Sequence, residues 1–223
     1  MTWGLLSLIG VGFLVGFRHA FEPDHLAAVT TLAAREKGWG HAARLGVAWG
    51  VGHTLSVAAV AIVLMVLGIR VPDRFYTTAE LGVAVLLVLL GVSTLWREAR
   101  RHLASLGEAH AHAHKHHAQH VHPEQLRSAS RALVFGLAHG LAGSGAVIVL
   151  LVAAAATLQA QMMYLLAFGA GTVAGMTGVT LLTGAVTGLV GRSHERALVT
   201  LQVGAALAST AVGLLLGWNT LQG

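Results

Sequence analysis

The chain has 223 residues, of which 55% are hydrophobic and only 10% are charged, and its mean hydropathy is +0.71. A water-soluble domain normally carries about 25% charged residues, so this composition excludes an ordinary soluble domain. The formal charge of +5 comes from a small excess of Lys and Arg, which in such a chain indicates membrane topology and no nucleic-acid partner. No cysteine is present, so disulfides and thiolate ligands are excluded, and any metal site must use nitrogen and oxygen atoms.

Long uncharged segments predict an all-α integral membrane protein with about six transmembrane helices in the lipid bilayer. A helix that crosses a bilayer needs about 20 mostly apolar residues. Residues 45–69 and everything after Arg196 carry no charge, and the uncharged stretch between Arg131 and Arg192 is long enough to cross twice. The expected spans are Thr2–Ala34, Gly40–Ile69, Thr78–Trp96, Ser130–Thr157, Met162–Gly191 and Ala197–Trp218.

The first of these spans is too long to be one straight helix. At 1.5 Å per residue it would reach about 50 Å, whereas the hydrocarbon core is about 30 Å thick. Pro23 lacks an amide donor and disfavours helical dihedrals at Glu22. We therefore expect the first helix to be interrupted near Pro23, with an opened turn around residues 19–23. Pro23 and Asp24 then lie in the first turn of the second piece.

The charges between the spans predict the orientation. Most Lys and Arg residues follow the first, third and fifth spans, whereas the other side holds only Arg70 and Arg74. By the positive-inside rule, both termini lie outside and the long loop after Trp96 is cytoplasmic. The first span has no basic residue ahead of it, so we expect a retained helix and not a signal peptide. The expected location is the cell (inner) membrane.

The two halves of the chain resemble each other. Gly16-Phe-Arg-His19-Ala-Phe recurs 120 residues later as Gly136-Leu-Ala-His139-Gly-Leu. Each half has three spans, and an odd number inserts the second half upside down, which is the inverted-repeat plan of many secondary transporters. We therefore predict a first three-helix repeat at 1–96, a His-rich cytoplasmic linker at 97–129 and a second three-helix repeat at 130–223.

The segment His19-Ala-Phe-Glu-Pro-Asp24-His25 carries most of the chemistry. Ionisable groups inside a membrane span are costly to bury and mark ion or proton paths. On a straight helix His19 and His25 point in different directions, but an opened turn before Pro23 brings both imidazoles and the Asp24 carboxylate together. Such a set suits nickel, cobalt, zinc or non-haem iron. The alternative is that the three groups only pair with one another.

Two further histidines lie within apolar spans. His53 follows Gly50-Val-Gly52 in the second span, and His139 lies near the cytoplasmic end of the fourth. Either is a metal ligand or a hydrogen-bonded structural residue. Glu22 is a less certain candidate, because a carboxylate here can bind the metal, accept a proton, cap a helix or pair with Arg18.

Two motifs are similar to those of the nickel/cobalt transporter family (NiCoT/NicO). His19-x4-Asp24-His25 resembles the family signature, and Leu45-Gly-Val-Ala-Trp-Gly-Val-Gly-His53-Thr resembles its second motif. The segment around His139 resembles the smaller six-span, UreH-like branch. The resemblance implies that His19, Asp24, His25 and His53 contact the metal during import. Many members have eight spans and Asp-Ala in place of Glu22-Pro23, which bears on substrate and direction.

The predicted cytoplasmic loop is rich in histidine, which is typical of metal binding. Flexible imidazoles would buffer divalent ions weakly, unless the segment is only a solvated spacer. The histidines concerned are His110, His112, His114, His116, His117, His120 and His122.

The sequence thus favours a permease for Ni²⁺ or Co²⁺ that is no enzyme and has no prosthetic group, with a cytoplasmic metallochaperone or a homo-oligomer as protein partners. Nothing resembles a Walker ATP site. One alternative is a b-type haem or redox subunit with His53 and His139 as ligands. The other is an intramembrane zinc hydrolase in which Glu22 or Asp24 activates a metal-bound water.

Overall fold

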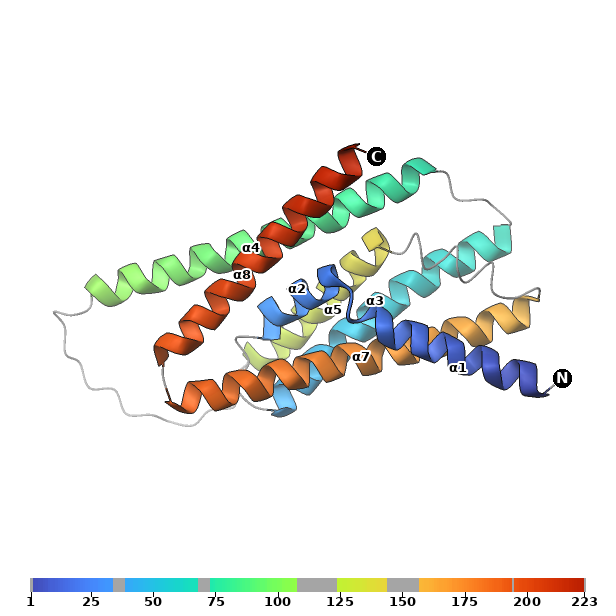
Figure 1. Cartoon of the computed structure of the whole chain (residues 1–223), viewed down its shortest axis with the longest axis horizontal. Coiled ribbons are helices and arrows are strands. Elements are labelled where there is room, and N and C mark those ends of the chain that lie inside the picture. The colour runs from blue at the N-terminus through green and yellow to red at the C-terminus, as the bar shows by residue number, and fades with distance from the viewer. Residues whose placement is uncertain are drawn as a thin grey trace.

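The computed structural model contains only α-helices among the residues that it describes, and these are drawn in Figure 1. The described residues are 2–33, 39–67, 73–107, 124–143, 157–193 and 195–222. The helices are α1 (Thr2–His19), α2 (Pro23–Ala33), α3 (Trp39–Leu67), α4 (Asp73–Gly107), α5 (Glu124–Gly143), α7 (Leu158–Ser193) and α8 (Glu195–Gln222).

These helices confirm an all-α integral membrane protein. Four of them, α3, α4, α7 and α8, are long and apolar enough to cross a membrane. The pair α1 and α2 is bent by 61° and would form a fifth, broken span, as predicted from Pro23. The predicted fourth span, 130–157, begins in α5, but its second part lies outside the described residues. The total of six spans therefore stays a prediction.

Two helices extend into the predicted linker at 97–129. α4 continues past Trp96 to Gly107 because residues 97–106 contain neither Pro nor Gly, and glycine is the usual residue at a helix end. Local polar contacts support this extension: Arg97 Nε donates a hydrogen bond to the Ser93 carbonyl at 3.0 Å, and Arg101 lies 3.7 Å from Glu98. α5 likewise starts at Glu124, within the same predicted segment.

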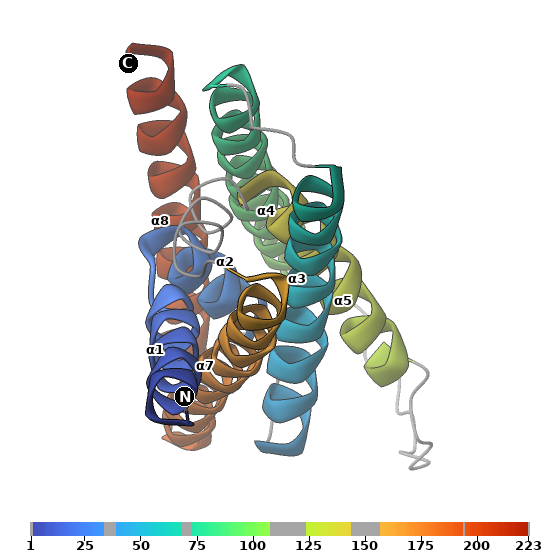
Figure 2. The same cartoon turned by 90° about the vertical axis from the view of Figure 1, so that its right-hand side faces the viewer.

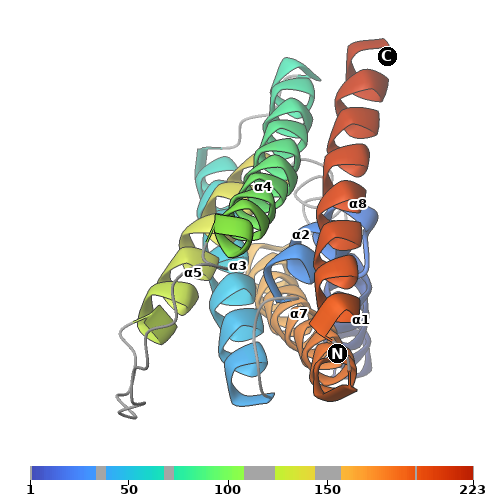
Figure 3. The same cartoon turned by 90° about the vertical axis from the view of Figure 1, so that its left-hand side faces the viewer.

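The short helix α2 lies at the centre of the bundle. It packs against α8, α7, α4 and α3, and Figure 1 shows it between α8 and α7. The most extensive contacts join α3 to α5, α4 to α8, α1 to α7 and α3 to α7. Figure 2 shows α1, α7, α3 and α5 across one end view, and Figure 3 shows α2 between α8 and α3 from the opposite side. The polar residues at the start of α2 are therefore enclosed by helices from both halves.

Two helix contacts match each other across the halves of the chain. A Cβ atom at Gly16 in α1 would collide with the Phe168 carbonyl of α7, and one at Gly136 in α5 would collide with the Trp49 carbonyl of α3. Glycine lets backbones approach this closely. Gly16 and Gly136 are also the residues that open the two similar sequence segments. Related halves would produce this equivalence, while the exact boundaries of the repeats stay a prediction.

Candidate metal centre

The break between α1 and α2 presents the polar motif to the core. α1 ends at His19, and the Glu22 amide donates to the His19 carbonyl at 3.0 Å. The Leu26 amide then donates to the Glu22 carbonyl at 2.9 Å, which starts α2. Pro23 stands at the first helical position, where a missing N–H costs no hydrogen bond. Asp24 lies in the first turn, where the helix dipole favours its negative charge.

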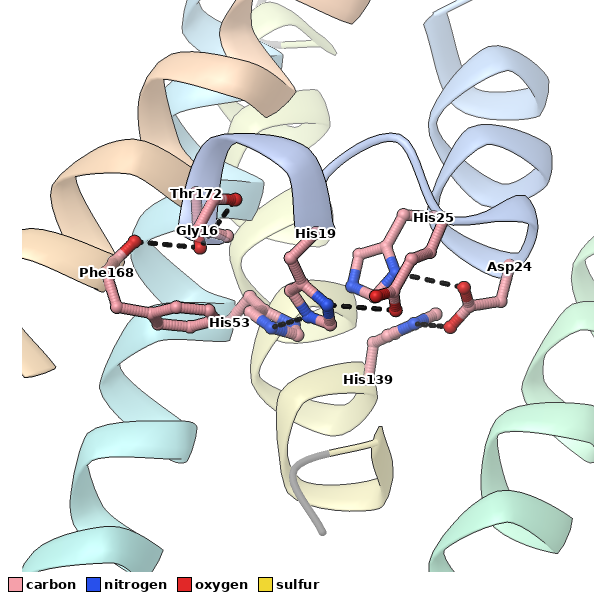
Figure 4. A network of polar contacts seen from close by, with 9 residues as sticks. Gly16, His19, Asp24, His25, His53, His139, Phe168 and Thr172 are labelled. Atoms are coloured by element: carbon pink, nitrogen blue, oxygen red, sulfur yellow. Dashed lines mark hydrogen bonds and ion pairs between the residues drawn. The ribbon is translucent and has the colours of Figure 1, made fainter. Parts of the chain in front are cut away.

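Side chains from four helices meet at this break, as Figure 4 shows. His19 comes from the end of α1, Asp24 and His25 from α2, His53 from α3 and His139 from α5. The four histidines are between 0% and 5% exposed, whereas the Asp24 side chain is 21% exposed. The structure therefore brings together all five residues predicted as the principal ligands.

Asp24 joins the two halves of the chain through its two carboxylate oxygens. His25 Nδ1–H donates to Oδ1 and His139 Nε2–H donates to Oδ2, each at 3.1 Å. An ionised carboxylate only accepts hydrogen bonds, so these ring nitrogens carry the protons. In neutral imidazoles the opposite nitrogens keep their lone pairs. Those nitrogens, His25 Nε2 and His139 Nδ1, are buried and have no hydrogen-bond partner among the described residues.

A second chain of contacts runs from Glu22 to His53. His19 Nδ1–H donates to Glu22 Oε2 at 2.9 Å, so Nε2 of His19 keeps its lone pair. Nε2 of His53 lies 3.3 Å from that atom and can donate to it. The Glu22 side chain is 53% exposed, which makes it the accessible end of this chain. The Glu22 carboxylate thus contacts His19. Arg18, the partner considered in the sequence analysis, is the neighbouring residue in the chain.

The donor atoms are close enough together to hold an ion. His19, His25 and His53 form one group, and Asp24, His25 and His139 form another; within each group the ligand atoms lie within 4.8 Å of one another. Two nitrogens that each bind an ion at about 2.1 Å can be at most about 4.2 Å apart. The side chains therefore need to move only slightly closer together to bind one ion. Imidazole and carboxylate ligands suit nickel, cobalt, zinc and iron.

The same geometry argues against a haem between His53 and His139. The His25 ring centroid lies 4.9 Å from that of His53 and 4.4 Å from that of His139. A haem held by these two histidines would place its macrocycle between them. The His25 ring occupies that space, so the haem alternative fits this packing poorly.

Two buried aromatic rings flank the histidines and were not predicted as part of the site. Phe168 lies 5.5 Å from His19 and Trp49 lies 5.8 Å from His139, measured between ring centroids. Both aromatic side chains are 0% exposed. Their sequences contain a signal that could have found them, since Trp49-Gly-Val-Gly-His53 and Phe168-Gly-Ala-Gly-Thr are alike.

The second of these segments ends at Thr172, where the first ends at His53. Thr172 Oγ1 donates to the Gly16 carbonyl at 3.2 Å and the Phe168 carbonyl at 2.9 Å, as Figure 4 shows. A threonine paired in this way supplies no nitrogen ligand. The centre is therefore lopsided, because its candidate imidazole ligands come from α1, α2, α3 and α5 and none comes from α7.

The predicted loop ligands lie outside the described residues. They are His110, His112, His114, His116, His117, His120 and His122. Ser144 and Gly145, which follow His139 as Asp24 and His25 follow His19, also lie outside them. The described part of the centre thus consists of four buried histidines, the partly buried Asp24 and the more exposed Glu22.

Comparison with known proteins identifies the family of this chain. The profile of the NicO family, described as High-affinity nickel-transport protein, matches residues 5–177. The chain is also 32% identical over 181 residues to Urease accessory protein UreH of Bacillus sp. (strain TB-90), which covers 81% of this chain and 77% of that protein. No solved structure matches the chain. The profile spans the whole described centre, so the chain belongs to the NicO family of nickel-transport proteins, whose members are metal transporters and not enzymes.

Proposed function

We propose that this chain imports Ni²⁺ or Co²⁺ across the cytoplasmic membrane through the buried histidine and aspartate centre. The observation that carries the proposal is the convergence of four imidazoles and one carboxylate inside an apolar helix bundle. Buried ionisable groups are costly in a membrane and are retained for ion paths. Family membership supports a metal ion as the substrate.

The position of the centre suits a transported ion. His53 is the central residue of the 29-residue helix α3, so the centre lies near the midplane if α3 crosses the bilayer. Interrupted helices hold substrates at this depth in many secondary transporters. The imidazoles replace water ligands of the ion, and Asp24 offsets part of its charge. Release requires that binding stay incomplete or exchangeable.

Glu22 serves this centre as a positioning residue. Its contact with Nδ1 of His19 fixes the ring with the Nε2 lone pair toward His53. Carboxylate partners of metal-binding histidines orient the ring and raise its basicity in the same way. Because its side chain is half exposed, Glu22 also places a negative charge where a cation arrives.

The distribution of charge supports the proposed direction and driving force. α3 begins and α4 and α7 end toward the left of Figure 1, whereas the N-terminus lies to the right. In the sequence, most basic residues of these helices lie near the start of α3 and the ends of α4 and α7, and the positive-inside rule supports a cytoplasmic side for these ends. The membrane potential then favours inward movement of a cation by about 2.3 kcal/mol per charge per 100 mV. The relative's name, Urease accessory protein UreH, is compatible with an accessory role for this chain, and a cytoplasmic metallochaperone as the recipient stays a prediction.

Transport by purified protein in lipid vesicles tests the proposal. Wild-type chain should accumulate Ni²⁺ or Co²⁺ when the vesicle interior is negative, and His19→Ala or His25→Ala should nearly abolish the flux. His102→Ala is the matched control, since His102 is exposed on α4 and remote in sequence from the motif. Measuring vesicles of both orientations with competing ions determines the ion and the direction. Wild-type flux in His19→Ala and His25→Ala would contradict the proposed site.

A further inference from the structure

Resting on the proposed function, we propose that the centre holds the transported ion in two alternative positions that share His25. One is the three-histidine position, formed by His19, His25 and His53. The other is the aspartate position, formed by Asp24, His25 and His139. The ion moves by exchanging the other two ligands while His25 serves both positions.

The geometry makes His25 the common member. Its ring centroid lies 4.4 Å from that of His19, 4.9 Å from that of His53 and 4.4 Å from that of His139. No other residue belongs to both described groups. Its Nδ1 faces Asp24, and Figure 4 shows its other nitrogen on the side of His19. Each nitrogen of this imidazole therefore faces a different set of ligands.

The two positions exclude each other. A neutral imidazole has one lone pair, so His25 binds an ion through Nε2 or through Nδ1, but not through both at once. Two divalent ions on opposite sides of one ring would also repel each other strongly in this buried setting. One ion per chain follows. Moving the ion from one side to the other moves the ring proton to the opposite nitrogen, so no proton is gained or lost overall.

Asp24 has a different role in each position. With the ion in the three-histidine position, Asp24 accepts a hydrogen bond from Nδ1–H of His25 and orients the ring, as carboxylates beside metal-bound histidines commonly do. In the aspartate position Asp24 binds the ion directly. The two positions also differ in charge, because the first has only neutral ligands and the second includes a carboxylate. The ligand field of a bound ion therefore reports which position is filled.

Binding of Co²⁺ to variants that each keep only one complete position tests the proposal. His139→Ala leaves the three-histidine position intact, and His53→Ala leaves the aspartate position intact. The full-length chain is used with asparagine in place of the loop histidines, so that the loop does not bind Co²⁺. The replaced residues are His110, His112, His114, His116, His117, His120 and His122. Equilibrium dialysis gives the stoichiometry, visible d–d bands give the ligand set, and vesicle uptake gives the flux.

We expect the parent chain, with all five residues of the centre intact, to bind one Co²⁺. His139→Ala and His53→Ala should each retain one Co²⁺, with different d–d spectra, while uptake falls at least about tenfold. His25→Ala should lose binding from both positions. His102→Ala, an exposed histidine on α4, should leave stoichiometry, spectrum and uptake unchanged. If either alanine variant does not yield monodisperse protein, His139→Asn and His53→Asn are judged by the same criteria.

Three results would overturn the proposal. Identical spectra and equal losses of affinity in the His139 and His53 variants would indicate one site with all five ligands. Two Co²⁺ ions bound at once would show that the positions are independent. Full uptake by either variant would show that one position suffices. If the parent chain neither binds nor moves Co²⁺ or Ni²⁺, the proposed function itself fails, which is a distinct outcome.

Discussion

Nε2 of His139 lies 3.1 Å from Oδ2 of Asp24, although 115 positions separate the two residues. This contact ties α5, in the second half of the chain, to the motif at the start of α2. His139 is 0% exposed and its other ring nitrogen has no partner among the described residues. From sequence, His139 is the weakest of the five candidates, because nothing local connects it to the motif. In the structure it lies directly against the Asp24 carboxylate.

Replacing Asp24 by asparagine should lower Ni²⁺ or Co²⁺ uptake about 10- to 100-fold. His25 and His139 donate to different oxygens of the carboxylate, and an amide replaces one of these acceptors by an NH₂ group. It also removes the only negative charge in direct contact with those two rings among the described residues. Initial uptake rates in vesicles measure the effect. Glu80→Gln, an exposed carboxylate on α4, is the control; equal rates for Asp24→Asn and Glu80→Gln would contradict the prediction.

Replacing Glu22 by glutamine should have a smaller effect, on the order of tenfold in uptake. The amide can present either its oxygen or its NH₂ group to Nδ1 of His19, so it no longer selects the ring form with Nε2 free. Nitrogen-15 NMR of labelled histidine should then show a mixture of His19 tautomers. Glu22→Asp should restore the single tautomer and also the metal flux. A single unchanged tautomer in Glu22→Gln would mean that Glu22 does not position His19.

Adding one methyl group at Gly171 should destabilise the bundle. A Cβ atom there would collide with the Phe13 carbonyl of α1, and backbone cannot yield as a flexible side chain can. The free energy of unfolding should fall by on the order of 2 kcal/mol. The measurement is the melting temperature in detergent, which should be lower. Gly178→Ala, on the same helix α7, has nothing within 4 Å and should be tolerated. Equal melting temperatures for the two variants would refute the close α1–α7 contact.

Deleting Glu108–His122 should lower metal-binding capacity while leaving the initial uptake rate within about twofold. The five candidate ligands of the centre come from α1, α2, α3 and α5, all outside this segment, and a histidine-rich tract is predicted to buffer divalent ions. Dialysis against Ni²⁺ and vesicle uptake measure capacity and rate separately. Complete loss of uptake by a well-folded deletion protein would show that the segment is part of the transport path.

The predicted orientation can be tested with single introduced cysteines, because the chain has none. A membrane-impermeant maleimide added to intact cells should label Gly223→Cys at the C-terminal end. Ala111→Cys, in the predicted cytoplasmic loop, should react only after the membrane is permeabilised. The reverse labelling pattern would place the loop outside and would reverse the proposed direction of transport.

Much of the fold was predictable because its signals are local. The excess length of the first span and the effect of Pro23 on the dihedrals of Glu22 predict the break that the structure shows between α1 and α2. His19, Asp24 and His25 are recognisable because three ligand-type groups within seven residues are rare in an apolar span. Helix lengths were less predictable. α4 continues well beyond Trp96, since hydropathy marks where a helix leaves the membrane and not where it ends.

The arrangement of the site depends on packing between helices, which sequence spacing does not contain. Nothing near Glu22 indicates that it contacts His19 and not Arg18, because both lie within reach on α1. The flanking rings of Trp49 and Phe168 become part of the site only through the α3–α5 and α1–α7 contacts. A comparison of the two halves that extended to the aromatic residues would have identified both.

The glycine contacts have a mechanical consequence. At Gly16 and Gly136 the paired helices touch backbone to backbone, so α1 lies tightly against α7 and α3 lies tightly against α5. His53 and His139 lie on the pair formed by α3 and α5, whereas His19 lies on the pair formed by α1 and α7. If one helix pair slid past the other, the distance of 3.3 Å between Nε2 of His19 and Nε2 of His53 would increase. The distance between His53 and His139 would stay the same. A rocking motion would thus open one side of the centre while the other keeps its shape.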